Sequence, residues 1–199
     1  MGKKWIYLFI AIILIPVIIY YTYRQKFTIT KILKGSDGIS YGITSKFGIE
    51  KKLNRFVEIR KRINKLVEYC KENDYPDVNR SHRLVERWEN ANLGETNPLD
   101  DTVAFVVDKG REFKVCLTDK ETNELESLNS TMFVALHEVS HLMSKEWGHG
   151  TEFWENFRII LELSIKLGIY EYRNFQNKPD NFCGTVIYSE PCNNSTCTK

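Results

Sequence analysis

The sequence has little net charge, little proline and no internal repeat. Its 199 residues carry 28 Lys and Arg against 26 Asp and Glu, a formal net charge of +2 at pH 7. That balance excludes a strongly basic nucleic-acid-binding protein and an acidic disordered chain. With 11 Gly and 5 Pro, the chain is also neither collagen-like nor of low complexity. The composition is therefore that of a folded domain with additions.

Cysteine is sparse as well, and its five residues lack the paired CxxC spacing of a structural zinc site. Cys70 and Cys116 lie on an apolar helix stripe and in a β-rich run, so we expect two buried thiols there. Cys183, Cys192 and Cys197 crowd the last 17 residues, and the sequence leaves open whether they form disulfides. Because five is an odd number, not all of the cysteines can pair within the chain.

Only one long apolar run is present, at the N-terminus. Residues 5–23 contain no charge and are flanked by Lys or Arg on both sides. As a helix these 19 residues would be roughly 28 Å long, about the hydrocarbon thickness of a bilayer. The run ends in tyrosines rather than in the small residues of a signal-peptide cleavage site. We therefore expect a retained single-pass anchor over residues 1–26, followed by a linker or stalk over residues 27–50.

The small net charge conceals a division along the chain. Residues 24–74 carry a net charge of +7, and residues 75–199 a net charge of −7. By the positive-inside rule, the basic residues after the apolar run favour a cytoplasmic catalytic domain. N-glycosylation sequons and the clustered cysteines favour an oxidising lumen instead. The sequence thus predicts a single-pass membrane protein and leaves the side of its folded domain open.

Helical and β-strand patterns alternate in the rest of the chain, which predicts an α+β domain over residues 51–199. Apolar positions at steps of three and four indicate amphipathic helices, and β-rich runs around a Gly-containing turn indicate a hairpin. Asn79 or Ser81 is the expected N-cap of a short helix, and Asn129, Ser130 and Thr131 supply the same chemistry for the next one. The expected helices cover residues 51–74, 79–88, 131–146 and 152–167, and the hairpin joins 102–107 to 111–117.

The expected helix after Thr131 contains the motif HExxH at residues 137–141. Residues four apart project from the same face of a helix, so His137 and His141 can reach one metal ion. Glu138 lies about 100° further round the helix, where it can accept a proton from a zinc-activated water. An apolar stripe opposite the two histidines would face the core. This pattern predicts two Zn²⁺ ligands and a catalytic acid/base.

A catalytic zinc ion needs a third protein ligand. His149 follows His141 by eight residues and lies between Gly148 and Gly150, which allow the backbone to turn back toward the first helix. We favour His149. Glu152 on the second helix is the competing candidate, followed by Glu155.

The segment His137–Trp154 (HEVSHLMSKEWGHGTEFW) resembles the core of small zinc metallopeptidases of the WLM, SprT-like and YgjP-like group. It is most similar to the WLM-type metallopeptidases of large DNA viruses, some of which have an N-terminal membrane segment, and Phe182-Cys183-Gly184 resembles their tail. The match covers residues 131–184, with a motif core over 131–170. The resemblance implies a small zincin-like fold with an active-site helix, a second helix and a short antiparallel sheet. It also implies His137, His141 and His149 as zinc ligands, Glu138 as the catalytic acid/base, and Phe153 and Trp154 packed beneath the metal.

These observations predict a membrane-anchored zinc metallopeptidase, an endopeptidase that acts on protein or peptide substrates. The host or virion membrane is the expected location if the chain is viral. One alternative is a catalytically silent adaptor that binds lipid or nucleic acid through the basic region 51–71. A second is a protease acting on DNA-bound proteins, although no aromatic interleaving of the basic region supports nucleic-acid binding. The substrate specificity, the oligomeric state and the group that stabilises the oxyanion stay open.

Overall fold

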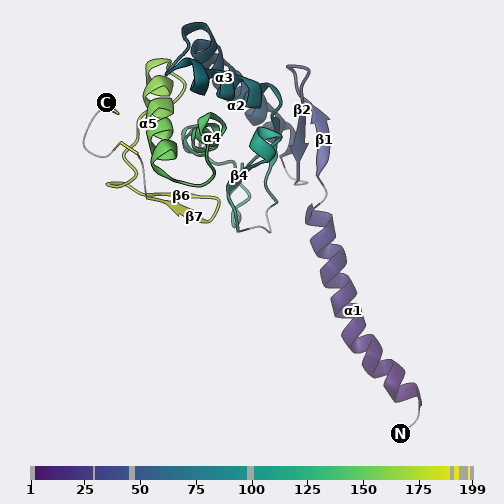
Figure 1. The fold of residues 1–199 in the computed structure, drawn as a ribbon. Coiled ribbons are helices and arrows are strands. Elements are labelled where there is room, and N and C mark those ends of the chain that lie inside the picture. Colours follow the sequence, from purple (N-terminus) through teal and green to yellow (C-terminus); the bar gives the residue numbers. More distant parts are fainter. Residues whose placement is uncertain are drawn as a thin grey trace.

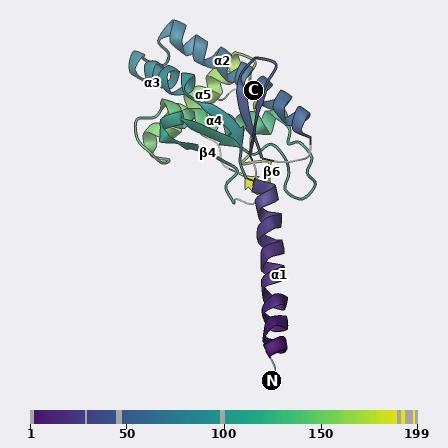
Figure 2. The ribbon, with the colours of Figure 1, turned by 90° about the vertical axis from the view of Figure 1, so that its right-hand side faces the viewer.

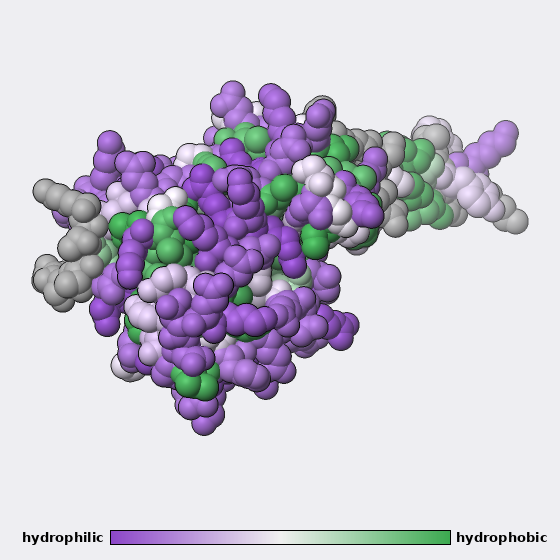
Figure 3. Space-filling view, turned by 90° about the horizontal axis from the view of Figure 1, so that it is seen from above, coloured by the Kyte–Doolittle hydropathy of each residue, from purple (hydrophilic) through white to green (hydrophobic). Residues whose placement is uncertain are grey.

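The computed structural model describes residues 3–28, 30–44, 48–97, 101–188, 191–192 and 197, apart from the side chains of residues 3, 6, 8 and 23–28. It shows a mixed α/β body from which one helix, α1 (Lys3–Thr28), extends on its own (Figures 1 and 2). Apolar side chains line α1 and are solvent-exposed, for example Ile12 at 62% and Tyr21 at 62%. They contrast with the largely hydrophilic face of the body (Figure 3). In the part of the chain that is described, no helix reaches the length and hydropathy needed to cross a membrane.

A five-stranded mixed sheet forms one layer of the body, in the order β1-β2-β3-β5-β4. The outer pairs β1–β2 and β4–β5 are antiparallel, whereas β3 is parallel to both β2 and β5. Gly42 and Gly94 face each other across β2 and β3, where a Cβ atom on Gly94 would lie 3.1 Å from the carbonyl oxygen of Gly42. The strands are β1 (Lys31–Lys34), β2 (Ser40–Ile43), β3 (Asn92–Glu95), β4 (Ala104–Val107) and β5 (Glu112–Val115).

The sheet corrects two predictions. Residues 31–43 form β1 and β2 and belong to the folded body, whereas the sequence suggested a linker over residues 27–50. The sheet is mixed rather than antiparallel, because β3 forms from a segment in which no strand was expected. The predicted hairpin is confirmed as β4 and β5, joined through a turn at Asp108–Gly110.

Helices α2 (Ile49–Asn73) and α4 (Leu128–Met143) pack against this sheet, and α3 (Val78–Glu89) and α5 (Thr151–Lys166) pack against α4. The apolar stripe predicted for α2 is buried from Phe56 to Cys70. The helices begin one to three residues earlier than expected: Asp77 caps α3 through the Arg80 amide, and Ser127 caps α4 through the Ser130 amide. Each helix is confirmed in type and approximate position.

The C-terminal part adds a small two-stranded hairpin, β6 (Asp180–Phe182) and β7 (Thr185–Ile187). A disulfide between Cys116, just after β5, and Cys183, in the turn of this hairpin, ties it to the main sheet across 67 residues. The expectation of a buried thiol at Cys116 is therefore wrong, whereas Cys70 is a buried free cysteine as expected. Cys192 and Cys197 form a second, local disulfide.

Candidate metal centre

Three histidines converge at the surface end of α4. His137 and His141 lie one turn apart on α4, and His149 reaches them from the loop between α4 and α5. Their ligand atoms all lie within 4.8 Å of one another, and Nε2 of His137 is 3.0 Å from Nε2 of His149. His137 and His141 are half-buried, and His149 is exposed. The structure thus brings together the three residues that the sequence singled out as candidate ligands.

This donor set fits a zinc ion. Two nitrogen ligands of tetrahedral zinc, each about 2.0–2.1 Å from the metal, are about 3.3 Å apart, close to the separation of the His137 and His149 nitrogens. Burial, followed by the neighbouring imidazoles, lowers the pKa of His137 to about 3, and burial and His149 lower that of His141 to about 4. Both imidazoles are therefore neutral at physiological pH, as metal ligation requires. Three imidazoles leave a fourth tetrahedral position for water or substrate.

The ring of Phe153, at the start of α5, supports all three imidazoles from below. Its centroid lies 4.8 Å from that of His137, 4.3 Å from His141 and 4.6 Å from His149. Phe153 is buried, as the resemblance implied. Trp154 lies beside it as expected, with the two ring centroids 5.4 Å apart, but it is 37% exposed and also lines the adjacent cleft. The histidine cluster therefore rests on an apolar aromatic surface that excludes water from one side.

Glu138 is almost fully buried next to this cluster, with 5% of its surface exposed. Burial raises the pKa of its carboxyl to about 8 in the metal-free chain, because the carboxylate loses hydration. A divalent cation close by would lower that value again. A carboxyl that titrates near neutral pH at the edge of a cleft is suited to both accepting and donating a proton.

Glu152 holds the loop that carries His149 through hydrogen bonds to the loop backbone. The Glu152 carboxylate accepts hydrogen bonds from the backbone N–H of Lys145, at 3.1 and 3.0 Å, and from that of Glu146 at 3.3 Å. It also pairs with Arg83 at 3.3 Å. Both oxygens are directed to the loop backbone, so this arrangement favours His149 over Glu152 as the third ligand.

Two arginines of α3 fix the end of α4, a role that the sequence did not reveal. Arg87 donates to the carbonyl oxygens of His141, Leu142 and Ser144, at 3.3, 3.0 and 2.6 Å, and Arg83 donates to that of Met143 at 2.9 Å. These carbonyls are the orphan acceptors at the helix C-terminus. The only sequence signal was two basic residues four apart on a short helix, which is also the pattern of an ordinary solvated face.

A cleft of about 250 Å³ opens directly beside His137 and Glu138. It lies between α4, α5, the residues around the start of β4, and the C-terminal hairpin strand β7 with Tyr188. The distant segments 103–104 and 186–188 thus meet at the site, and no pattern in the sequence predicts that they do.

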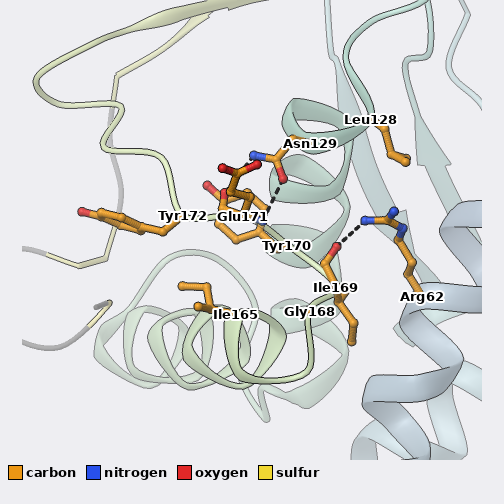
Figure 4. Close-up of a pocket in the computed structure, with 9 residues that line it drawn as sticks. All are labelled: Arg62, Leu128, Asn129, Ile165, Gly168, Ile169, Tyr170, Glu171 and Tyr172. Atoms are coloured by element: carbon orange, nitrogen blue, oxygen red, sulfur yellow. Dashed lines mark hydrogen bonds between the residues drawn. The ribbon is translucent and has the colours of Figure 1, made fainter. Parts of the chain in front are cut away.

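A larger cavity, of about 770 Å³, is lined by none of the three histidines (Figure 4). Its polar groups bind one another: Arg62 donates to the Ile169 carbonyl at 2.6 Å, and Asn129 and Glu171 exchange two hydrogen bonds of 2.8 and 2.9 Å. Tyr170 and Tyr172 line this cavity and not the cleft beside Glu138. The residues that line it are Arg62, Leu128, Asn129, Ile165, Gly168, Ile169, Tyr170, Glu171 and Tyr172.

Comparisons with known proteins reveal viral relatives without an assigned activity. No protein-family model matches the chain. The uncharacterized protein R325 of Acanthamoeba polyphaga mimivirus is 31% identical over 129 residues, which make up 65% of this chain and 61% of R325. The uncharacterized protein 136R of Invertebrate iridescent virus 6 is 32% identical over 105 residues, 50% of this chain and 56% of that protein. Among solved structures, Wss1 from Saccharomyces cerevisiae matches 63% of this chain and 87% of its own, with a TM-score of 0.49 and 19% identity. The chain therefore spans about three fifths of the curated relatives that it matches.

Proposed function

We propose that the chain is a zinc-dependent metallopeptidase, an endopeptidase of the WLM type. The observation that carries this proposal is the convergence of His137, His141 and His149 beside the buried carboxyl of Glu138, at the edge of a cleft. A structural zinc site would have no use for an acid/base at that position. The motif at residues 137–154 supplies the family assignment.

Each group has a distinct role in peptide hydrolysis. Zinc held by the three imidazoles would lower the pKa of a water molecule and polarise the scissile carbonyl. Glu138 takes the proton of the attacking water and returns it to the leaving amine. Glu152 and Arg87 hold the loop and the helix end on which the histidines lie. Phe153 keeps water away from the protein side of the imidazoles.

The β4 strand favours a polypeptide substrate over a small molecule. β4 is an edge strand that pairs with β5 alone among the described strands, and it packs along α4. Residues before and within it line the spaces next to His137 and next to His141. An extended peptide can add to such an edge through main-chain hydrogen bonds, which places its own carbonyls beside the histidines.

The test combines metal quantification with a peptidase assay on the full chain in detergent. Wild type is expected to bind one zinc ion per chain and to cleave an unfolded protein substrate. Glu138→Gln is expected to retain zinc and lose cleavage by several orders of magnitude, whereas His149→Ala loses zinc. A Glu138→Gln protein with full activity would contradict the role of Glu138 as the catalytic acid/base. Zinc binding without cleavage by wild type would favour the adaptor.

The adaptor alternative, in which the basic region 51–71 binds lipid or nucleic acid, has less support. Four basic side chains of α2 donate to main-chain carbonyls of neighbouring segments, so these groups are engaged within the protein. These are Arg55 to Glu126, Arg60 to Ala91, Arg62 to Ile169 and Lys65 to Leu167. A peptidase assay with and without DNA tests the related idea of a protease acting on DNA-bound proteins, for which stimulation by DNA is expected.

Membrane attachment is a separate proposal, which rests on the apolar run in the sequence and on the exposed side chains of α1. The structure does not support a membrane-spanning helix. The test is extraction of cell membranes with alkaline carbonate. We expect the wild-type chain to stay with the membrane and a variant with Ile12→Lys, Ile15→Lys and Ile19→Lys to be released. Release of both would overturn stable insertion of α1 into the membrane, which is the form of attachment that this test detects.

A further inference from the structure

The cleft beside Glu138 has a strongly apolar lining. The nine residues that line it besides His137 and Glu138 are all aliphatic or aromatic, and their only polar side-chain groups are the Tyr188 hydroxyl and the Trp154 indole N–H. Four parts of the chain contribute them. They are Val103 and Ala104 at the start of β4, Phe133 and Val134 of α4, Trp154 and Phe157 of α5, and Val186, Ile187 and Tyr188 in and after β7.

Several of these side chains are unusually exposed for their type. Val186 is 53% exposed, Tyr188 68% and Trp154 37%, although each is large and apolar or aromatic. Trp147, in the loop before His149, is 64% exposed and lines a separate small space next to His141. Exposed apolar surface gathered around a candidate catalytic centre is typical of a surface that a ligand covers.

The size and position of the cleft indicate what covers it. Its volume of about 250 Å³ lies below the roughly 300–1,000 Å³ of sites for drug-sized ligands. It therefore suits one side chain rather than a whole cofactor. Because His137 and Glu138 form part of its lining, a side chain seated there belongs to a residue next to the bond being cleaved. A charged side chain would lose its hydration there without gaining an ionic partner from the nine apolar and aromatic residues.

We propose that this cleft selects substrates by binding one aliphatic or aromatic side chain adjacent to the scissile peptide bond. The inference rests on the proposed peptidase function and adds the class of residue that the enzyme recognises. Val186 and Tyr188, on the hairpin held by the Cys116–Cys183 disulfide, form the specificity-determining wall opposite α4 and α5.

The first arm of the test measures binding without cleavage. Short fluorescent Gly- and Ser-rich peptides that differ at one central position (Leu, Phe, Ala, Asp or Lys) are titrated with zinc-loaded Glu138→Gln protein, with detergent micelles alone as a blank. The Leu and Phe peptides are expected to bind about 10-fold or more tightly than the Ala peptide, because a hydrophobic pocket discriminates by about that factor per missing apolar group. The Asp and Lys peptides are expected to bind more weakly still.

The second arm maps cleavage sites in an unfolded protein by mass spectrometry. Wild type is expected to cut next to aliphatic and aromatic residues, and Val186→Asp to lose this preference and accept basic residues. Val78→Asp is the matched control, since Val78 is 61% exposed on α3 and lines none of the spaces beside the histidines. Both positions are exposed, so neither change disturbs the core.

The outcomes separate the two proposals. Cleavage without an apolar preference, or a preference that Val186→Asp leaves intact, overturns the specificity inference and leaves the peptidase function standing. Selective binding of the Leu and Phe peptides that Val186→Asp abolishes, without cleavage by wild type, supports the cleft as a binding site and overturns the peptidase function. If the protein shows neither selective binding nor cleavage, both proposals are overturned.

Discussion

The Glu152 carboxylate gives a sharp test of how the candidate metal centre is assembled. It joins the start of α5 to the backbone of the loop that presents His149, through the N–H groups of Lys145 and Glu146 and a salt bridge to Arg83. Glu152→Ala removes these contacts and leaves all three histidines in place. We expect the variant to fold and to bind zinc more weakly.

The size of the effect follows from the contacts. A hydrogen bond to a charged group contributes about 1.5–3 kcal/mol net. The Glu152 side chain is 32% exposed, so solvent screening reduces the contribution of the whole carboxylate to about 2 kcal/mol. If zinc binding has to supply this ordering energy, its affinity falls about 30-fold, since 1.4 kcal/mol corresponds to a factor of ten. Loss of groups that orient metal ligands typically costs 10- to 100-fold, in agreement with this figure.

The assay is competition for zinc between the protein and a chromophoric chelator. Glu155→Ala is the matched control, because Glu155 lies on the same helix, is 49% exposed and pairs with Arg80 rather than with the loop. We expect the control to bind zinc as wild type does, and His149→Ala to lose more affinity than Glu152→Ala. Circular dichroism establishes that each variant is folded.

Two results would refute the reasoning. If Glu152→Ala binds zinc with wild-type affinity, the carboxylate does not order the loop. If Glu152→Ala is as damaging as His141→Ala while His149→Ala has little effect, then Glu152 is itself the third ligand and His149 is not.

Three further predictions concern stability and reactivity. Lys52→Met leaves the buried Glu95 carboxylate without its ionic partner and should lower the free energy of unfolding, measured in urea, by about 3–5 kcal/mol. The double variant Lys52→Met with Glu95→Leu should recover most of that loss, and equal stability of the two variants would contradict this reasoning. Burial raises the pKa of the Cys70 thiol to about 12. In the absence of a reductant, iodoacetamide at pH 8 should therefore label one thiol per chain in urea and none in the folded chain. Rapid labelling of the folded chain would show that Cys70 is accessible. In metal-free protein, burial lowers the pKa values of His137 and His141 to about 3 and 4. Below pH 6.5 the unfolded chain therefore binds more protons at these two histidines than the folded chain, and stability should fall as the pH drops from about 6.5 toward 4. Thermal melting that is unchanged over this range would argue against buried neutral imidazoles.

The sequence was sufficient for the parts of the fold that depend on local periodicity. The α2 stripe from Phe56 to Cys70 and the alternation around Asp108–Gly110 are signals that a single segment carries, and both elements formed where expected. Helix starts were misplaced because several adjacent residues offer equivalent capping groups: Asp77 competes with Asn79, and Ser127 with Asn129. Which residue caps depends on how the preceding chain enters the helix.

The rest depends on contacts between distant segments. β2 and β3 are four-residue strands that contain Gly42 and Gly94, and they show no alternation, so only their pairing in the sheet defines them. The histidine cluster was predictable because HExxH is a helical spacing and His149 follows closely. The arginines of α3 were not predictable, because they lie 54 residues or more before His141 in the sequence. The wall of the cleft was not predictable either, because the Cys116–Cys183 disulfide holds its hairpin against a distant part of the chain.

Because the β6–β7 hairpin follows the histidines in the sequence, the candidate metal ligands are synthesised before one wall of the cleft. The three clustered histidines all precede residue 150, whereas one wall of the cleft begins only at Val186. During synthesis, a chain that has emerged as far as α5 already has its three imidazoles but lacks that wall. Under the proposed function, formation of β7 and of the Cys116–Cys183 bond would then be the step that allows the chain to hold a substrate. Under the proposed function, the peptidase would be unable to hold and cut surrounding proteins before Val186 has been made.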